Sequence, residues 1–223
     1  MAEHFAPDAV LAAGLELLGS GALWPHVGTS LERIGIGLAG AIAIGGPLGV
    51  LVGSSPRVDE LTSPAIQFLR MISPLSWMPL AVMALGVGDR PIWFLLVAAA
   101  IWPILLSTAA GVRQLPPEWL ELGRSLAATR RELLFRLVIP GVVPHVLTGV
   151  RLAIGTLWIV LVPAEMLGVS AGLGYFILDA RDRLAYSELM ALVILVGALG
   201  FSLDALARWA CQRGAASSAA HSI

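Results

Sequence analysis

Residues 91–112 read PIWFLLVAAAIWPILLSTAAGV, a run without a single charged side chain. A helix rises about 1.5 Å per residue and the hydrocarbon core of a bilayer is about 30 Å thick, so roughly 20 apolar residues are needed to cross it. This run is long enough to cross with a little tilt. It therefore predicts a transmembrane helix near the middle of the chain.

The overall composition points to the same environment. Hydrophobic residues make up 57% of the 223 residues and charged residues only 13%, whereas a soluble domain carries about 25% charged residues. The mean hydropathy is +0.85. All 14 basic residues are Arg and the net charge is -1, so the composition gives no indication of nucleic-acid binding. Too few polar groups remain to cover a water-facing surface.

Four further apolar runs accompany this central one, and their ranges are 34–53, 65–87, 138–167 and 189–207. The first is rich in Gly and Ala, the composition that lets membrane helices approach closely. The second is expected to break near Pro74 and Pro79. The predicted fold class is therefore all-α integral membrane, with about five transmembrane helices.

These spans divide the chain into three parts. We expect an N-terminal extracytoplasmic or interfacial segment over residues 1–33, a transmembrane domain over 34–210 and a disordered cytoplasmic tail over 211–223. Residues 9–18 are either part of an interfacial segment or the remnant of a further helix. An odd number of spans places the two termini on opposite sides of the membrane.

The distribution of Arg predicts the orientation, because short loops rich in Arg or Lys stay in the cytoplasm. Five Arg residues lie between 113 and 136, Arg57 lies in the first loop, and Arg208 and Arg213 follow the last span. In a five-span arrangement all three regions fall on one side. We therefore expect the N-terminus outside and the C-terminus in the cytoplasm.

Residues 113–137 are longer than a simple connection between two spans requires. Leucines recur at helical spacing, with arginines on the other side of the predicted helix. By periodicity alone, this segment is either an amphipathic helix lying in water or on the membrane, or a surface built for docking.

The same stretch resembles the EAA loop of ABC importer permeases. Glu121, Leu122 and Gly123 stand at the Glu-Ala-Ala positions, Ala127 stands at the position of a glycine, and the spacing from Glu121 to Pro140 is kept. The chain departs from the pattern where Leu and Gly replace two alanines and where Ala127 replaces the glycine. The resemblance covers residues 23–209 and is closest to the nitrate, sulfonate (taurine) and bicarbonate branch.

This resemblance implies a type I ABC importer permease fold in which the loop docks on a cytoplasmic ABC ATPase. The residues that it assigns to this coupling loop are Glu121, Gly123, Arg124, Ala127, Leu137 and Pro140. It also implies an extracytoplasmic substrate-binding protein, a permease homodimer in lipid, and ATP with Mg held by the ATPase. The chain itself has no phosphate-binding loop, so we expect no catalytic residue, no metal site and no cofactor in it.

The implied location is the bacterial cytoplasmic (inner) membrane and the implied cargo is a small anion. Nitrate, bicarbonate or cyanate would come first, with sulfonates or taurine next. Ionisable groups inside a membrane are costly and mark functional sites, so Arg151 and Glu165 are candidates for a pathway or gate. Arg151 is also readable as a structural ion-pair partner, and Glu165 as a contact for the binding protein or as a structural residue. Trp77 and Trp158 are candidates that also fit packing or interface roles.

Other classes remain open from the residues. An ATP-independent small channel or secondary transporter would need its own gate, usually with internal repeats or several buried acids. A membrane enzyme would need a cluster of His, Cys, Asp or Glu inside the spans. Neither pattern is evident in the sequence.

Overall fold

The computed structural model describes residues 7–220, with the side chains at positions 120, 124, 130, 210 and 212–220 outside the description. Its elements are the helices α1 (Pro7–Ser20), α2 (Leu23–Ser54), α3 (Pro56–Met71), α4 (Met78–Leu85), α5 (Asp89–Arg113), α6 (Pro117–Ser125), α7 (Arg130–Leu133), α8 (Ile139–Glu165), α9 (Leu173–Asp182) and α10 (Tyr186–Ala220), with a 3-10 turn η2 (Pro74–Trp77) and a π-helical turn η3 (Leu134–Val138). No strand occurs within residues 7–220. The predicted all-α fold is confirmed.

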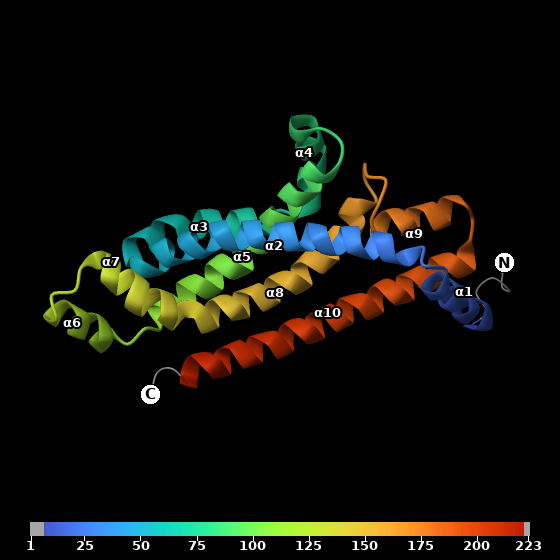
Figure 1. Ribbon diagram of the computed structural model, residues 1–223. Helices are drawn as coiled ribbons and strands as arrows, with labels where there is room; N and C mark the ends of the chain where they lie inside the picture. Colours follow the sequence, from blue (N-terminus) through green and yellow to red (C-terminus); the bar gives the residue numbers. More distant parts are fainter. Residues whose placement is uncertain (1–6, 221–223) are drawn as a thin grey trace.

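Helices α2, α5 and α8 form the core and lie side by side (Figure 1). Gly45, Gly49 and Gly53 recur at every fourth residue of α2, on one side of the helix. A Cβ atom at these positions would lie 2.6 to 2.9 Å from backbone carbonyl oxygens of α5. The two backbones therefore touch along a ridge where only glycine fits, as small residues allow in membrane helix pairs.

The relative direction of α2 and α5 determines the path of the chain between them. Gly45 meets Ile101 and Gly53 meets Ala109, so α2 and α5 run parallel. The chain between Ser54 and Asp89 must therefore return to the end of the bundle where α2 began. Only the pair formed by α3 with η2 and α4 is available for this return.

The returning segment is a broken span. Within residues 7–220, four helices are long and apolar enough to cross a membrane on their own, and α3 with η2 and α4 qualifies only as a pair bent by 82°. Ile72 and Ser73 at the break are extended, with ψ of 124° and 127°, because a residue before proline is disfavoured in the helical region and Ser73 precedes Pro74. The helix before the break starts at Pro56 rather than near the predicted residue 65.

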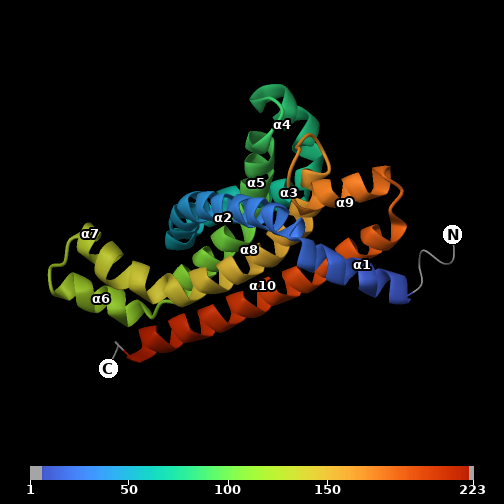
Figure 2. The ribbon, with the colours of Figure 1, turned by 45° about the vertical axis from the view of Figure 1, so that its right-hand side comes forward.

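The other elements surround this core. Helix α10 runs along α8, α9 packs where α8 and α10 meet, and α1 lies against α10 (Figure 2). Leu23, Leu173 and Leu192 are buried in the cluster that joins α2, α9 and α10. The described chain begins and ends at opposite ends of the molecule (Figure 1).

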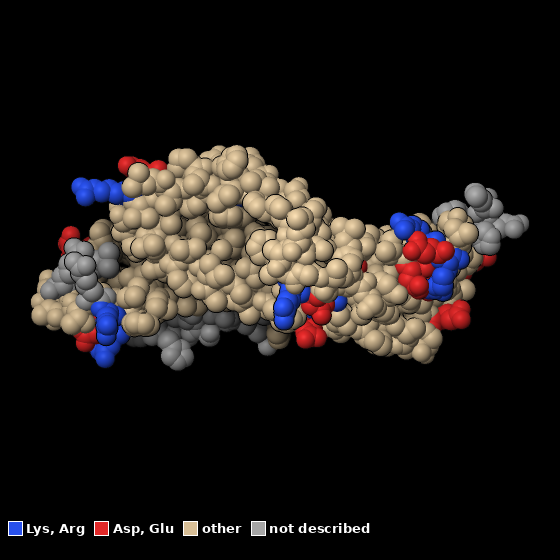
Figure 3. All heavy atoms as spheres, turned by 90° about the horizontal axis from the view of Figure 1, so that it is seen from above, with Lys and Arg blue, Asp and Glu red and all other residues tan. Residues whose placement is uncertain are grey.

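Charged side chains gather towards the two ends, with one further group between them and broad uncharged surfaces elsewhere (Figure 3). Many of the exposed side chains along the spans are large and apolar, including Leu51, Ile159, Ile194 and Phe201. Such a surface suits lipid or a further protein chain as its neighbour rather than water.

Two predicted limits differ from the structure at the ends of the chain. The sequence places the first span at 34–53, whereas α2 begins at Leu23 and includes Arg33, a charge that the helix tolerates because it is paired inside the protein. The sequence also predicts a disordered tail over 211–223, whereas α10 continues to Ala220, through a stretch rich in alanine, the best helix former. Residues 1–6 and 221–223 of the predicted terminal segments lie outside the described residues.

Candidate functional site

Residues 113–137 form a helical hairpin at one end of the molecule, beyond the ends of α5 and α8 (Figure 1). Helix α6 leads outward, and α7 with η3 leads back into α8. The predicted loop is thus two short helices with a turn between them.

The turn is made at Ala127, whose φ of +55° is left-handed. The Ala128 N–H donates to the Gly123 carbonyl at 3.0 Å, the bond that spans six residues in a Schellman helix end. Glycine is the residue that adopts this conformation without a steric penalty. Ala127 stands at the position where the EAA pattern has glycine. Because it is not glycine, it adopts this left-handed conformation at a conformational cost.

Two local interactions shape the hairpin around this turn. Gly123 faces the side chain of Leu133 so closely that a Cβ atom at 123 would overlap it. The Thr129 N–H donates to Glu132 Oε2 at 2.8 Å, and the Glu132 N–H donates to Thr129 Oγ1 at 3.3 Å. This reciprocal pair is a capping box at the start of α7. The first interaction places α6 against α7, and the second stabilises the start of α7.

The other predicted residues of the loop are spread over the hairpin. Glu121 is exposed on α6, Leu137 is half-buried in η3, and Pro140 is exposed in the first turn of α8. Arg124 belongs to α6, and its side chain lies outside the description. These residues share one segment but do not converge on one point.

The hairpin exposes large apolar side chains at the end of the bundle. The exposed fractions are 49% for Trp119, 62% for Leu122, 74% for Leu126 and 65% for Phe135. We call these four residues the hairpin apolar patch. Trp119, Leu122 and Leu126 lie between the candidate spans, and Phe135 lies near the start of the candidate span Arg131–Glu165. Exposed apolar side chains at the end of a bundle are typical of a protein–protein contact.

A buried ionic cluster lies nearer the opposite end, around Glu165 at the end of α8. Glu165 has no exposed surface. Its carboxylate oxygens lie 2.7 and 2.9 Å from Ser30 Oγ, 2.7 Å from Arg33 Nη1 and 2.9 Å from the Gly174 backbone nitrogen. Every neighbour donates a hydrogen bond, so the arrangement holds an ionised carboxylate.

Arg33 extends the cluster to two further elements. Its Nε and Nη2 donate to Asp89 Oδ1 at 2.9 and 2.6 Å, and its Nη1 donates to the Ala171 carbonyl at 2.7 Å. Arg33 is 4% exposed, whereas the Asp89 side chain is 51% exposed. One guanidinium therefore ties α2 to the start of α5, the end of α8 and the loop before α9.

That loop is held by a second residue of α2. His26 Nδ1 accepts a hydrogen bond from the Gly172 N–H at 3.1 Å, and its ring stacks on Phe176 at 4.6 Å. Gly172 has a φ of +119°, and a Cβ atom there would lie 2.5 Å from Glu165 Oε1. The loop can therefore close over the cluster only with glycine at position 172.

The remaining candidates lie apart from this cluster. Arg151 is exposed in the middle of α8, with no hydrogen bond or ion pair among the described side chains, and so it is not brought together with Glu165. Trp77 lines a cavity of about 150 Å³ between α3, η2 and α5. The Trp158 ring packs against Gly200 of α10. Of the predicted pathway or gate residues, only Arg151 presents an unpaired charge.

Sequence reasoning missed Ser30 and Arg33, the side chains that bind Glu165, and Asp89, which shares Arg33 with Glu165. The sequence did contain a signal for these residues. An acid in an apolar span, such as Glu165, needs a cation near it. Ser30 and Arg33 are spaced by three residues and therefore share one side of a helix. Among residues 7–220, no group of three or more His, Cys, Asp or Glu is placed to hold a metal ion.

Comparison with known proteins agrees with this architecture. The chain is 37% identical over 194 residues to the bicarbonate transport system permease protein CmpB of Synechococcus elongatus, covering 86% of this chain and 69% of the relative. It is 37% identical over 175 residues to the nitrate import permease protein NrtB of Synechocystis sp., covering 78% and 64%. A solved structure of the MetNI methionine ABC transporter in an inward-facing conformation matches with a TM-score of 0.67 at 17% identity, covering 88% of this chain and 94% of that chain, and shows the fold.

Residues 45–213 match the family described as the inner membrane component of binding-protein-dependent transport systems. The matched region runs from the second half of α2 into the last part of α10 and includes the helical hairpin and Glu165. This multi-pass membrane chain therefore belongs to that family, the permease subunits of ABC importers.

Proposed function

We propose that this chain carries a small anion across the bacterial inner membrane, driven by a cytoplasmic ATPase that binds the hairpin 113–137. The observation that carries the proposal is the hairpin apolar patch, in which Leu122, Leu126 and Phe135 are more than 60% exposed at one end of the bundle. Apolar side chains exposed there need a covering surface, and a groove on an ATPase would provide it. The hairpin then transmits the movement of that ATPase to α5 and α8, to which it is directly joined.

The proposed orientation follows the charges. Arg113, Arg131 and Arg136 belong to the hairpin end, and the described chain also ends there. Because short segments rich in Arg are retained in the cytoplasm, the hairpin and the C-terminus would be cytoplasmic. Helices α1 and α9 and the N-terminus would then be extracytoplasmic.

The proposed cargo is nitrate, bicarbonate or cyanate, with sulfonates or taurine next. Nitrate and bicarbonate are supported by two relatives, a nitrate import permease and a bicarbonate transport permease. Arg151 supports an anion, because a guanidinium in the middle of α8 without a counter-ion among the described residues needs water or an anion beside it. Trp77 and Trp158 would shape the spans around the path rather than bind the cargo.

The working assembly would contain partners. We propose a permease homodimer, two cytoplasmic ABC ATPase subunits that hold ATP and Mg, and an extracytoplasmic substrate-binding protein. The exposed face of α8 around Arg151 and Leu152 supports the second permease copy, because a charge inside the membrane is tolerated where it faces a protein or a water-filled path.

The test is co-purification of the chain with the candidate ATPase, followed by ATP hydrolysis in lipid. Wild type is compared with Leu126→Glu and with a Glu121→Ala, Arg124→Glu double variant. The matched control is Val87→Glu, since Val87 is 77% exposed and lies between α4 and α5, away from the hairpin. We expect the hairpin variants to lose the complex or its coupled hydrolysis and the control to keep both.

Two outcomes would contradict the proposal. In the first, the wild-type chain binds no ATPase and passes solute alone, which would support a small channel or secondary transporter. In the second, the hairpin variants assemble and hydrolyse ATP like the control, which would place the docking surface elsewhere.

A further inference from the structure

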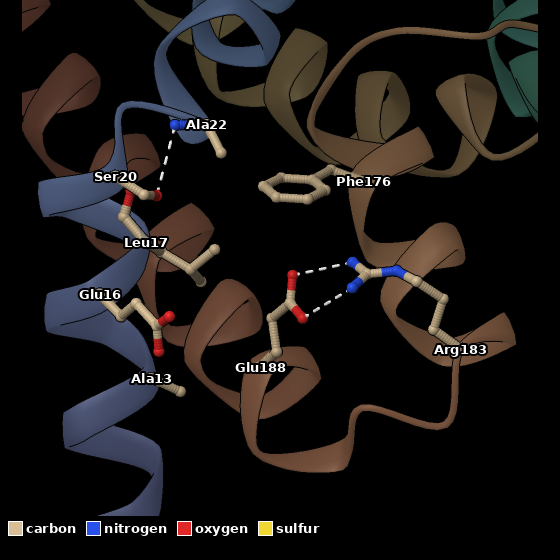
Figure 4. Close-up of a pocket in the computed structure, with 8 residues that line it drawn as sticks. All are labelled: Ala13, Glu16, Leu17, Ser20, Ala22, Phe176, Arg183 and Glu188. Carbon is tan, nitrogen blue, oxygen red and sulfur yellow. Dashed lines mark hydrogen bonds and ion pairs between the residues drawn. The ribbon is translucent and has the colours of Figure 1, made fainter.

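A cavity of about 310 Å³ lies at the end of the molecule opposite the hairpin. It is formed where α1, α9 and α10 meet, and its size is at the lower end of the range for ligand sites. Figure 4 shows its walls, which include Glu16, Leu17, Ser20, Phe176, Arg183 and Glu188. We call this cavity the α1 pocket. Apolar side chains and charged side chains thus face the same space.

The charge in the α1 pocket is unbalanced. Arg183 donates to Glu188 at 2.9 and 3.2 Å and to Asp179 at 2.9 Å. The hydrogen bonds to Glu188, above all, raise the pKa of Arg183. One cation is therefore shared by two carboxylates. Glu16 has no hydrogen bond or ion pair among the described residues. Two carboxylates, Glu16 and Glu188, therefore line the pocket with one cation, Arg183, which Asp179 outside the lining also engages, so the pocket has an excess of negative charge.

The position of Glu16 on α1 indicates which side of the helix faces water rather than lipid. Leu11 and Leu15 are 68% and 71% exposed, and Leu18 follows them on the same face. This apolar stripe suits the membrane surface. At about 100° per residue, Glu16 lies about 160° from Leu18 around the helix. The carboxylate therefore points away from the lipid-facing stripe.

We propose that the α1 pocket receives a Lys or Arg side chain of the extracytoplasmic substrate-binding protein, with Glu16 as its ion-pair partner. This inference rests on the proposed orientation and on the proposed binding protein. The unpaired carboxylate supplies the charge, Ser20 supplies an acceptor, and Leu17 and Phe176 supply an apolar wall for the aliphatic part of a long basic side chain. Helix α1 would thereby link the docked protein to α10, against which it packs.

The test uses the assembled permease–ATPase complex in phosphatidylglycerol nanodiscs, a lipid without a cationic headgroup. ATP hydrolysis is measured while the candidate substrate-binding protein is titrated. We expect Glu16→Gln to raise the half-saturating concentration about threefold and Glu16→Arg to raise it about tenfold, the range for a single charge pair at an interface. Maximal hydrolysis should be unchanged. The matched control, Asp8→Asn, changes an exposed acid of the same helix outside the pocket.

The outcomes separate this inference from the proposed function. If the binding protein does not stimulate wild-type hydrolysis at all, the proposed importer function fails. If it stimulates wild type and both Glu16 variants with the same half-saturating concentration, the pocket is not its docking site and the inference is overturned. A Glu16→Gln effect on thermal stability that appears only in phosphatidylethanolamine, with docking unchanged, would assign the pocket to a lipid ammonium group instead.

Discussion

Replacement of Arg33 by Met should strongly destabilise the chain. Arg33 is 4% exposed and neutralises Glu165, which has no exposed surface. The substitution keeps much of the apolar volume and leaves the Glu165 carboxylate buried with hydrogen bonds from Ser30 and Gly174 but without a cation. Removing one partner of a buried ion pair costs about 3–5 kcal/mol.

Replacing Glu165 as well as Arg33 gives a double-mutant cycle that measures the coupling between the two residues. In the Arg33→Met, Glu165→Met double variant no carboxylate remains buried at position 165, although Ser30 Oγ and the Gly174 N–H lose their acceptor. Each lost acceptor costs about 1–3 kcal/mol. The double variant should therefore be destabilised by less than the sum of the two single variants, with a coupling of about 2 kcal/mol or more.

Thermal unfolding of the purified chain in detergent measures the effect. At about 2–4 °C per kcal/mol for a chain of this size, Arg33→Met should lower the midpoint by about 10 °C. Arg113→Met is the matched control, because the ion pair of Arg113 with Asp59 is partly exposed, at 44% and 28%, and such pairs contribute only about 0–1 kcal/mol. Equal midpoint shifts for both variants, or additive effects of the Arg33 and Glu165 substitutions, would refute the reasoning.

Four further changes test other parts of the structure. Ala127→Gly should stabilise the hairpin by about 0.5–1 kcal/mol, because glycine relieves the left-handed conformation, and slower amide exchange in α6 would measure this. Thr129→Ala removes the capping box and should destabilise α7 by about 1 kcal/mol, seen as faster exchange there. Gly49→Ala should lower the thermal midpoint because its Cβ would lie 2.6 Å from a carbonyl oxygen of α5, whereas Gly46→Ala, which has open space, should not. Arg151→Gln should reduce anion uptake about tenfold while assembly with the ATPase is retained, since one charged hydrogen-bond donor contributes about 1.5–3 kcal/mol; unchanged uptake would remove Arg151 from the path.

The sequence predicted the elements that depend on composition. Long apolar runs identified the spans, and α5, whose bounds are Asp89–Arg113, differs from the predicted 91–112 by only a few residues. The resemblance of residues 113–137 to the EAA loop marked them as a docking segment, and the structure folds them as a hairpin of two short helices. Its left-handed turn lies at Ala127, the position where that resemblance has a glycine.

The features that depend on tertiary contacts were harder to predict. Arg33 marked the apparent end of a span because its partners, Asp89 and Glu165, are 56 and 132 residues away. Pro74 predicted a break after α3. The angle of 82° depends on how two helices and their connection pack, so the sequence did not predict it. The α1 pocket combines side chains of three helices, so the sequence around Glu16 gave no sign of it.

The central claim is that the hairpin apolar patch is covered by an ATPase. A photoreactive amino acid placed at Leu126 or Phe135 in the assembled complex tests it most directly, with Leu15 at the opposite end of the molecule as the control. The account predicts crosslinks to the ATPase from both hairpin positions and none from Leu15. Crosslinks to lipid alone from Leu126 and Phe135, in a complex that still hydrolyses ATP, would contradict it.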